Sequence, residues 1–146
     1  MLRALEIAAQ AAENGEVPVG AVLVDPITDR ILAECGNQVE TLNDPTAHAE
    51  IMVLRHAAGQ RGSPRLEGLD LYVTLEPCAM CASALSHARI RRVIFGAYDP
   101  KGGGVEHGAK VFDRETCHHR PEVIGGVEET KCGDILKNFF KSRRIA

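Results

Sequence analysis

The sequence has no apolar run approaching the roughly 20 residues that a helix needs to cross a bilayer. Its first residues lack the charged-then-apolar pattern of a secretory signal. It holds five cysteines, an odd number that suits reduced thiols better than a framework of paired disulfides. From these absences we predict a cytoplasmic protein that does not associate with a membrane.

An excess of basic residues is also missing. The chain has 17 Lys and Arg against 20 Asp and Glu, a formal net charge of −3, which argues against a protein coated in charge for nucleic acid. The charge is uneven, however. Residues 1–50 sum to −7, from two Arg against nine acidic residues, and residues 131–146 sum to +4, from five basic residues against Asp134. The basic end fits either a local footprint for phosphate or a solvated helix face.

The 146 residues show no internal repeat, low-complexity tract or interdomain linker, so we expect a single domain over residues 1–146. Apolar spacing and capping residues predict four helices: one with an apolar stripe of Leu2, Leu5, Ala9 and Ala12, one over 47–58 between Thr46 as N-cap and Gly59, one from Pro77 to about Ala88, and one from Glu128 onward. Apolar runs with β-branched residues predict strands at 17–24, 69–75, 91–97 and 123–124, and the turn after the first run predicts an antiparallel partner at 31–35. This alternation predicts the α/β class, with a mixed sheet flanked by helices.

Two short stretches combine the residue types of a zinc site, His48-Ala49-Glu50 and Pro77-Cys78-Ala79-Met80-Cys81. A catalytic zinc keeps about three protein ligands and one open position, and His48, Cys78 and Cys81 supply that number. Cys78 and Cys81 lie three residues apart at a predicted helix start, where both thiols can point the same way and the helix dipole favours thiolate. Glu50 is the carboxylate that could handle the protons of an attacking water.

The geometry of these motifs leaves alternatives. Residues two apart on a helix diverge by about 200°, so His48 and Glu50 can converge only over the N-terminal end of their helix. Cys-x-x-Cys alone also occurs in redox pairs and structural zinc knuckles. A closed structural site needs a fourth ligand, and the nearest candidates, His118 and His119, are adjacent residues that seldom supply one. The spacing therefore favours an open, hydrolytic zinc site between two helix starts.

A glycine-rich stretch, Lys101-Gly102-Gly103-Gly104, lacks the Gly-Lys-Ser/Thr order of a phosphate-binding P-loop. It fits a flexible active-site loop and a plain connector equally well. Glu76 is a second carboxylate close to the predicted metal ligands. We expect Glu76 to be structural, because Glu50 shares the helix start with His48 and Glu76 precedes a proline.

His-x-Glu with Pro-Cys-x-x-Cys is the signature of the zinc-dependent nucleobase and nucleoside deaminases. Within them the chain resembles the bacterial tRNA-specific adenosine deaminases over nearly its whole length. The stretches that carry the resemblance are Val17 to Val22, Asn43 to Ile51, Leu71 to Cys78, Phe139-Phe140 and Arg143-Arg144. Tyr98 departs from the pattern, because the family usually carries a basic or polar residue there.

The resemblance implies a three-layer α/β/α cytidine-deaminase-like fold with a mixed five-stranded sheet. It implies a homodimer that deaminates adenosine to inosine at the wobble position of the tRNA anticodon stem-loop, with one zinc ion per subunit. By the same resemblance His48, Cys78 and Cys81 bind zinc, Glu50 is the catalytic proton shuttle, and the substrate-binding residues are Asn37, Asp99, Phe139, Phe140, Arg143 and Arg144. From spacing alone, core packing is the favoured explanation of the two phenylalanines.

Two other functions fit parts of the pattern. A zinc-dependent deaminase of a free base or nucleoside, such as guanine or cytosine, uses the same metal motifs but has no need of a basic helix beside its pocket. A non-catalytic zinc-binding or RNA-binding module is a third class. Glu50 argues against it, because a structural metal site gains nothing from a carboxylate beside the metal.

Overall fold

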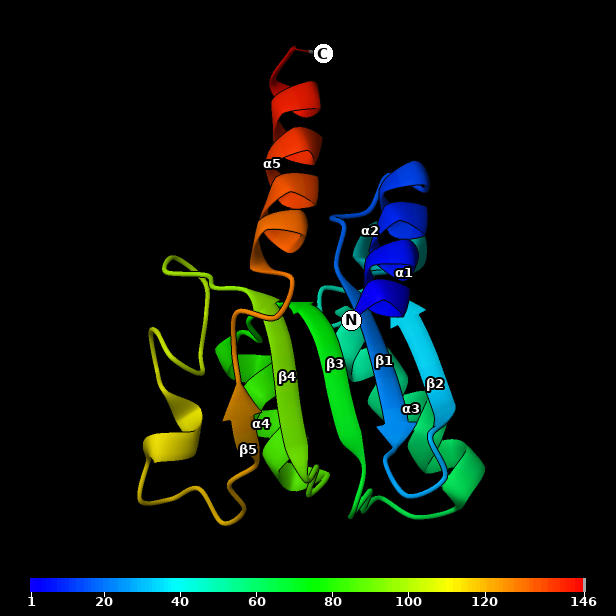
Figure 1. Cartoon of the computed structure of the whole chain (residues 1–146), viewed down its shortest axis with the longest axis vertical. Coiled ribbons are helices and arrows are strands. Elements are labelled where there is room, and N and C mark those ends of the chain that lie inside the picture. The colour runs from blue at the N-terminus through cyan, green and yellow to red at the C-terminus, as the bar shows by residue number, and fades with distance from the viewer. Residues whose placement is uncertain (146) are drawn as a thin grey trace.

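The computed structural model describes residues 1–145 and is built on one mixed sheet of five strands (Figure 1). Their order across the sheet is β2-β1-β3-β4-β5. β1 pairs antiparallel with β2 and β3, whereas β3, β4 and β5 are parallel. The strands are β1 (Gly20–Asp25), β2 (Arg30–Gly36), β3 (Asp70–Leu75), β4 (Arg92–Ala97) and β5 (Glu122–Ile124).

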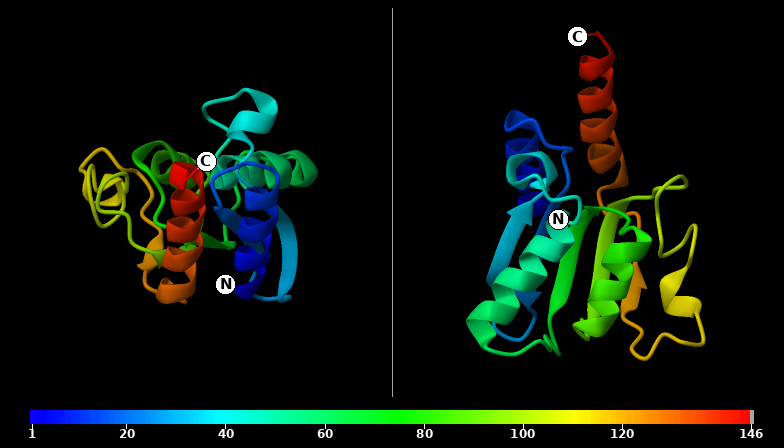
Figure 2. Two further views of the ribbon diagram at one scale, coloured as in Figure 1. Left: turned by 90° about the horizontal axis from the view of Figure 1, so that it is seen from above. Right: turned by 180° about the vertical axis from the view of Figure 1, so that it is seen from behind.

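Helices cover both faces of this sheet, which confirms the predicted three-layer α/β/α architecture. α1 (Leu2–Glu13) and α5 (Glu129–Ile145) lie on one face, and α3 (Ala49–Arg61) and α4 (Ala79–His87) lie on the other (Figure 2). A short helix, α2 (Val39–Leu42), lies between β2 and α3. Among the described residues, no helix has the length and apolar character needed to span a membrane.

The main hydrophobic core lies between the sheet and the α3/α4 layer. The central strands β3 and β4 point Leu71, Val73, Val93 and Phe95 into it, and none of these side chains is exposed. Burying an apolar side chain of this size contributes about 1.5–3 kcal/mol. Because β3 and β4 are parallel, their carboxyl ends meet at one edge of the sheet, where α/β folds commonly bind ligands.

The first helix confirms the expected element, but the predicted buried stripe is wrong. Leu2 is 59% exposed, and the face that packs on the sheet is made of Ala4, Ile7, Ala8 and Ala11. The reason is close approach: a Cβ at Gly20 on β1 would lie 2.7 Å from the backbone nitrogen of Ala8. Small side chains on α1 and a glycine on the strand let the two backbones come together.

The start of α3 also differs from the prediction. Thr46 does not cap the helix, because its hydroxyl donates to the Asp44 carboxylate at 2.7 Å. His48 occupies the N-cap position, and the side-chain oxygen of Asn37 accepts the Ala49 N–H at 2.8 Å. The helix passes through Gly59 and ends at Arg61; Gly62, at φ +69°, provides the left-handed C-cap. A residue from another segment thus caps the helix that carries His48.

Candidate active site

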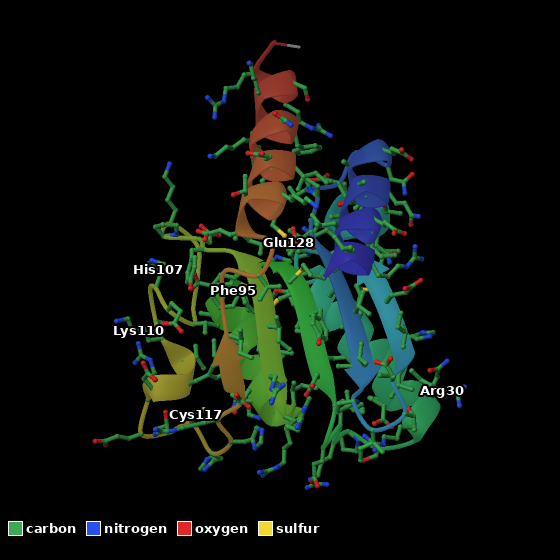
Figure 3. All side chains as sticks on the ribbon, in the orientation of Figure 1. Arg30, Phe95, His107, Lys110, Cys117 and Glu128 are labelled. Atoms are coloured by element: carbon green, nitrogen blue, oxygen red, sulfur yellow. The ribbon has the colours of Figure 1, made fainter. Side chains whose placement is uncertain are left out.

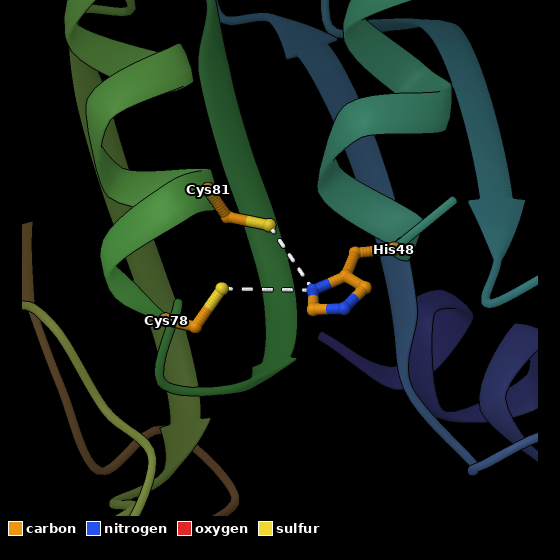
Figure 4. A group of neighbouring side chains, drawn as sticks. All are labelled: His48, Cys78 and Cys81. Carbon is orange, nitrogen blue, oxygen red and sulfur yellow. Dashed lines mark hydrogen bonds between the residues drawn. The ribbon is translucent and has the colours of Figure 1, made fainter. Parts of the chain in front are cut away.

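Three potential metal ligands converge between the starts of α3 and α4 (Figure 4). His48 is the N-cap of α3, Cys78 is the N-cap of α4, and Cys81 lies one turn into α4. The His48 Nδ1 atom is 3.6 Å from the Cys78 sulfur and 3.4 Å from the Cys81 sulfur. Two helix starts therefore face one another, as the sequence predicts.

These separations fit a tetrahedral zinc ion. With Zn–N near 2.0–2.1 Å and Zn–S near 2.3 Å, tetrahedral angles place a ligand nitrogen and sulfur about 3.6 Å apart. The ligand atoms of His48, Cys78 and Cys81 all lie within 4.8 Å of one another, and in the described chain this is the sole cluster of its kind. Three protein ligands leave one coordination position for a water or substrate.

The two thiols differ in their protonation. Hydrogen bonding from Cys81, with a further contribution from His48, lowers the pKa of Cys78 to about 4 although burial opposes the shift. The pKa of Cys81 is raised, because its proton is held by Cys78 and its sulfur is buried. The cluster thus holds one thiolate at neutral pH before any metal arrives, and a coordinated cation deprotonates the second thiol.

Glu50 lies in the first turn of α3, two residues after His48, and only 4% of it is exposed. Burial raises the pKa of its carboxyl to about 7, with the negative charge of Cys78 adding to the shift and His48 opposing it. A carboxyl with a pKa near 7 is populated in both protonation states at neutral pH. It can therefore take up a proton and give it back, which is the requirement for a proton shuttle.

A cavity of about 880 Å³ opens over this cluster. His48, Glu50 and Cys78 line it. Five of the six residues that the resemblance assigns to substrate binding also line it, namely Asn37, Asp99, Phe139, Phe140 and Arg143. Arg144, the sixth, is exposed and does not line the cavity. Residues from both ends of the chain thus meet around one hollow.

The aromatic pair of α5 stands at the rim of the cavity rather than in the core, so the core-packing explanation does not hold. Phe140 is 44% exposed, and neither ring belongs to the core cluster. The Phe139 and Phe140 rings meet edge to face with centroids 5.4 Å apart. The Arg143 guanidinium lies 4.5 Å from the centroid of the Phe139 ring and donates to the Gly15 carbonyl at 2.9 Å. The rim therefore offers an aromatic face, an edge and a cation.

Two polar residues line the cavity from separate loops. Asn37 follows β2, and its amide oxygen is committed to the Ala49 N–H. Asp99 follows β4, and its carboxylate accepts the Gly102 N–H at 2.9 Å. Both side chains are therefore held in place by hydrogen bonds to neighbouring backbone.

Glu16 is a cavity residue with no signal in the sequence. It is 2% exposed and accepts the Thr41 hydroxyl at 2.6 Å and the backbone N–H groups of Glu40 and Thr41. Burial raises its pKa, but these three donors outweigh burial, so the net pKa is lowered and Glu16 stays charged. A lone glutamate between a helix and a strand looks like a surface residue until α2 is placed over it.

The family model of the cytidine and deoxycytidylate deaminase zinc-binding region matches residues 1–97. A tRNA-specific adenosine deaminase of Agrobacterium fabrum is 54% identical over 142 residues, covering 97% of this chain and 92% of the relative. A solved structure from work on A-to-I editing by tRNA:A34 deaminases at the wobble position of transfer RNA has a TM-score of 0.88 at 55% identity, covering 91% of this chain and 95% of that one.

A more distant structure matches as well. Guanine deaminase from Bacillus subtilis, solved by X-ray crystallography, has a TM-score of 0.65 at 31% identity, covering 99% of this chain and 92% of that one. Deaminases that act on different molecules therefore share this architecture.

Proposed function

The chain belongs to the cytidine and deoxycytidylate deaminase family, and from this premise we propose that it converts adenosine to inosine at the wobble position of a tRNA anticodon by hydrolytic deamination. The proposal assigns His48, Cys78 and Cys81 to zinc binding and Glu50 to proton transfer. Its substrate-binding residues are Asn37, Asp99, Phe139, Phe140, Arg143 and Arg144.

One cavity carries this proposal, because it joins two kinds of residue in a single hollow. It is lined by His48 and Cys78 of the metal-ligand cluster and by the buried Glu50. It is also lined by the partly buried Phe139, the half-exposed Phe140 and Arg143 of α5. Exposed aromatic rings are platforms on which an unstacked base packs, and an arginine beside them suits a phosphate backbone. This combination of a metal-ligand cluster with aromatic and cationic side chains around one cavity supports the proposal.

When zinc is bound by the three side chains, it supplies the activation that makes water a nucleophile near neutral pH. Glu50 accepts a proton from the water as its oxygen adds to C6 of adenine, and passes that proton to N1. Glu50 then takes the remaining proton from the new hydroxyl on C6 and delivers it to the amino group, so the C6 carbonyl forms as ammonia leaves and adenosine and water yield inosine and ammonia. The target base has to leave the stack first, which an anticodon loop permits at low cost and a duplex does not.

The finer parts of the proposal concern assembly and location. Residues 1–146 act as one zinc-dependent deaminase domain, with one zinc ion per subunit. A single sheet with one main core over the described residues supports this reading. The family resemblance supports a homodimer that works in the cytoplasm, where tRNA is edited.

A deaminase of free guanine or cytosine is the competing function, and the likeness to the guanine deaminase supports considering it. The cavity residues of α5 favour the RNA substrate, because a free base has no sugar-phosphate backbone to contact Arg143. The higher identity to a tRNA-specific adenosine deaminase points the same way.

The test is incubation of the zinc-loaded protein with total tRNA, followed by digestion to nucleosides and chromatography for inosine. Free guanine and free cytosine are incubated in parallel, and xanthine and uracil are measured. Inosine that maps to the anticodon wobble position supports the proposal. Release of xanthine or uracil without inosine would replace it with the free-base function.

A further inference from the structure

We propose that Glu76 is a positioning residue that fastens the loop of residues 99–107 and thereby places Asp99 against the target nucleotide. This inference rests on the proposed function. Glu76 lies between β3 and α4, two residues before Cys78, and has no part in the proton transfers assigned to Glu50. Its contacts are with the loop that follows β4.

Four backbone N–H groups of the loop converge on the Glu76 carboxylate. One oxygen accepts the Asp99 N–H at 3.0 Å, and the other accepts those of Val105, Glu106 and His107 at 3.2, 3.0 and 3.1 Å. The His107 Nδ1 atom lies 2.8 Å from the first oxygen. A single side chain therefore holds both ends of the loop, whose last residue, His107, lies to one side of the sheet (Figure 3).

The Glu76 carboxylate is withdrawn from solvent and from the reaction. Its side chain has no exposed surface. Both oxygens are occupied by loop donors, which leaves no role as an acid or base toward substrate.

The glycine run is shaped to this carboxylate. A Cβ at Gly103 would lie 2.5 Å from the Glu76 carboxyl carbon and 2.6 Å from the Asp99 carbonyl oxygen. A Cβ at Gly104 would lie 2.6 Å from the Ala79 Cα at the start of α4. These contacts are far shorter than real Cβ atoms adopt, so glycine is required at both positions. The glycine-rich stretch is therefore packed closely against Glu76 and the start of α4, so neither a flexible loop nor a plain connector describes it.

The loop of residues 99–107 also borders the cavity. Asp99 and Gly102 line it, and the Asp99 side chain is itself tied to the Gly102 N–H. On the other side, the Gly104 N–H donates to the Pro77 carbonyl at 2.8 Å, directly before Cys78. Glu76 thus sets the distance between the loop that faces the substrate and the helix start that carries two metal ligands.

The direct test is Glu76→Gln in the zinc-loaded enzyme. Glutamine keeps the shape, but one of its two terminal atoms is a donor and can no longer accept a loop N–H. We expect KM for an anticodon stem-loop RNA to rise roughly 10- to 100-fold, as small misplacements of a binding group do, with kcat changed less than about threefold. Zinc content should stay at the wild-type ratio, because no ligand is touched.

Two further variants separate positioning from general loss of stability. Asp70→Asn removes another buried carboxylate, one that pairs with Arg91 at 2.7 Å beside the start of β4, and should leave KM and kcat unchanged. Gly103→Ala presses on Glu76 from the loop side without removing its charge and should also raise KM. If Glu76 acts through Asp99, Glu76→Gln should add little to the effect of Asp99→Ala, since residues acting through one contact are not additive.

These experiments distinguish failure of the inference about Glu76 from failure of the proposed function. Failure of the wild-type enzyme to form inosine would remove the proposed function. Hydrogen exchange would then still show whether Glu76 holds the loop of residues 99–107. If it does, the amides of Asp99 and of 105–107 should exchange faster in Glu76→Gln than in Asp70→Asn. With the wild type active, an unchanged KM, strict additivity with Asp99→Ala, or unchanged exchange would overturn the inference. So would failure of both the Glu76 and Gly103 variants to fold while Asp70→Asn folds.

Discussion

Replacing Glu50 by glutamine removes the proton shuttle while keeping the shape of the side chain. Three buried or nearly buried glutamates line the cavity, and the structure shows that the other two cannot take over. Glu16 is committed to Thr41 and the backbone of α2, and Glu76 is committed to the loop of residues 99–107. The rate should therefore fall by the full contribution of a general acid–base group, about 10²- to 10⁴-fold in kcat.

Unlike the rate, the stability of the metal-free protein should suffer less in Glu50→Gln than in the wild type as the pH rises. In the metal-free protein the pKa of Glu50 is raised from 4.5 to about 7. The folded state then holds a proton between pH 4.5 and 7 that the unfolded chain has released, so stability falls as pH rises through this window. A shift of this size corresponds to roughly 3 kcal/mol, at 1.36 kcal/mol per pH unit. Glu50→Gln lacks the titration, and its stability should fall less over the same range.

The assays are single-turnover deamination of an anticodon stem-loop with zinc-loaded protein, zinc analysis of the same samples, and urea unfolding of zinc-depleted protein at pH 5 and pH 8. The control is Glu67→Gln, an exposed glutamate in the loop before β3. Turnover within tenfold of wild type at full zinc content would remove Glu50 from the mechanism. Equal loss of stability between pH 5 and pH 8 in wild type and variant would refute the account of its burial.

Other changes test the metal, the rim and the scaffold. Cys81→Ser should lower the ratio of zinc to protein well below that of a matched Cys117→Ser control, measured by atomic emission; equal ratios would contradict the ligand assignment. Phe140→Ala should lower kcat/KM for stem-loop RNA by about 5- to 150-fold, the loss of one base-stacking contact of about 1–3 kcal/mol, with little change in thermal stability because the ring is half exposed. Glu16→Gln should lower stability at pH 7 by about 2 kcal/mol and flatten its decline in acid. The sign follows from the lowered pKa of Glu16 in the folded protein. A carboxylate with a lowered pKa stabilises the fold above its ordinary pKa and loses that effect as the pH falls through its folded value. The same decline of stability in acid for variant and wild type, measured by chemical denaturation, would contradict this prediction.

The elements of the fold were predictable because their local patterns are strong. Four of the five strands combine apolar and β-branched residues, β2 was predicted from the turn before it, and the observed sheet contains all five. The convergence of His48 with Cys78 and Cys81 was also predictable, since both motifs open helices that follow loops or strands. The spacing of potential ligands at the starts of predicted helices is thus enough to predict much of the metal site.

What escaped prediction depends on contacts between distant segments. The buried face of α1 is set by Gly20 on a strand, so the larger apolar residues Leu2 and Leu5 do not mark it. Thr46 looks like a cap locally, but Asp44 takes its hydroxyl and Asn37 supplies the cap from another loop. Packing across the sequence overrides local preference in each case.

The cap on α3 has a consequence for what the cavity can recognise. Because the Asn37 oxygen is held by the Ala49 N–H, one residue after His48, the orientation of its amide is set by the same helix start that presents the imidazole. Its amide nitrogen, which has no hydrogen-bond partner among residues 1–145, can only donate. A ligand packed against Asn37 therefore meets a hydrogen-bond donor of defined direction. An acceptor such as a ring nitrogen of a purine matches it, and an amino group in that place does not.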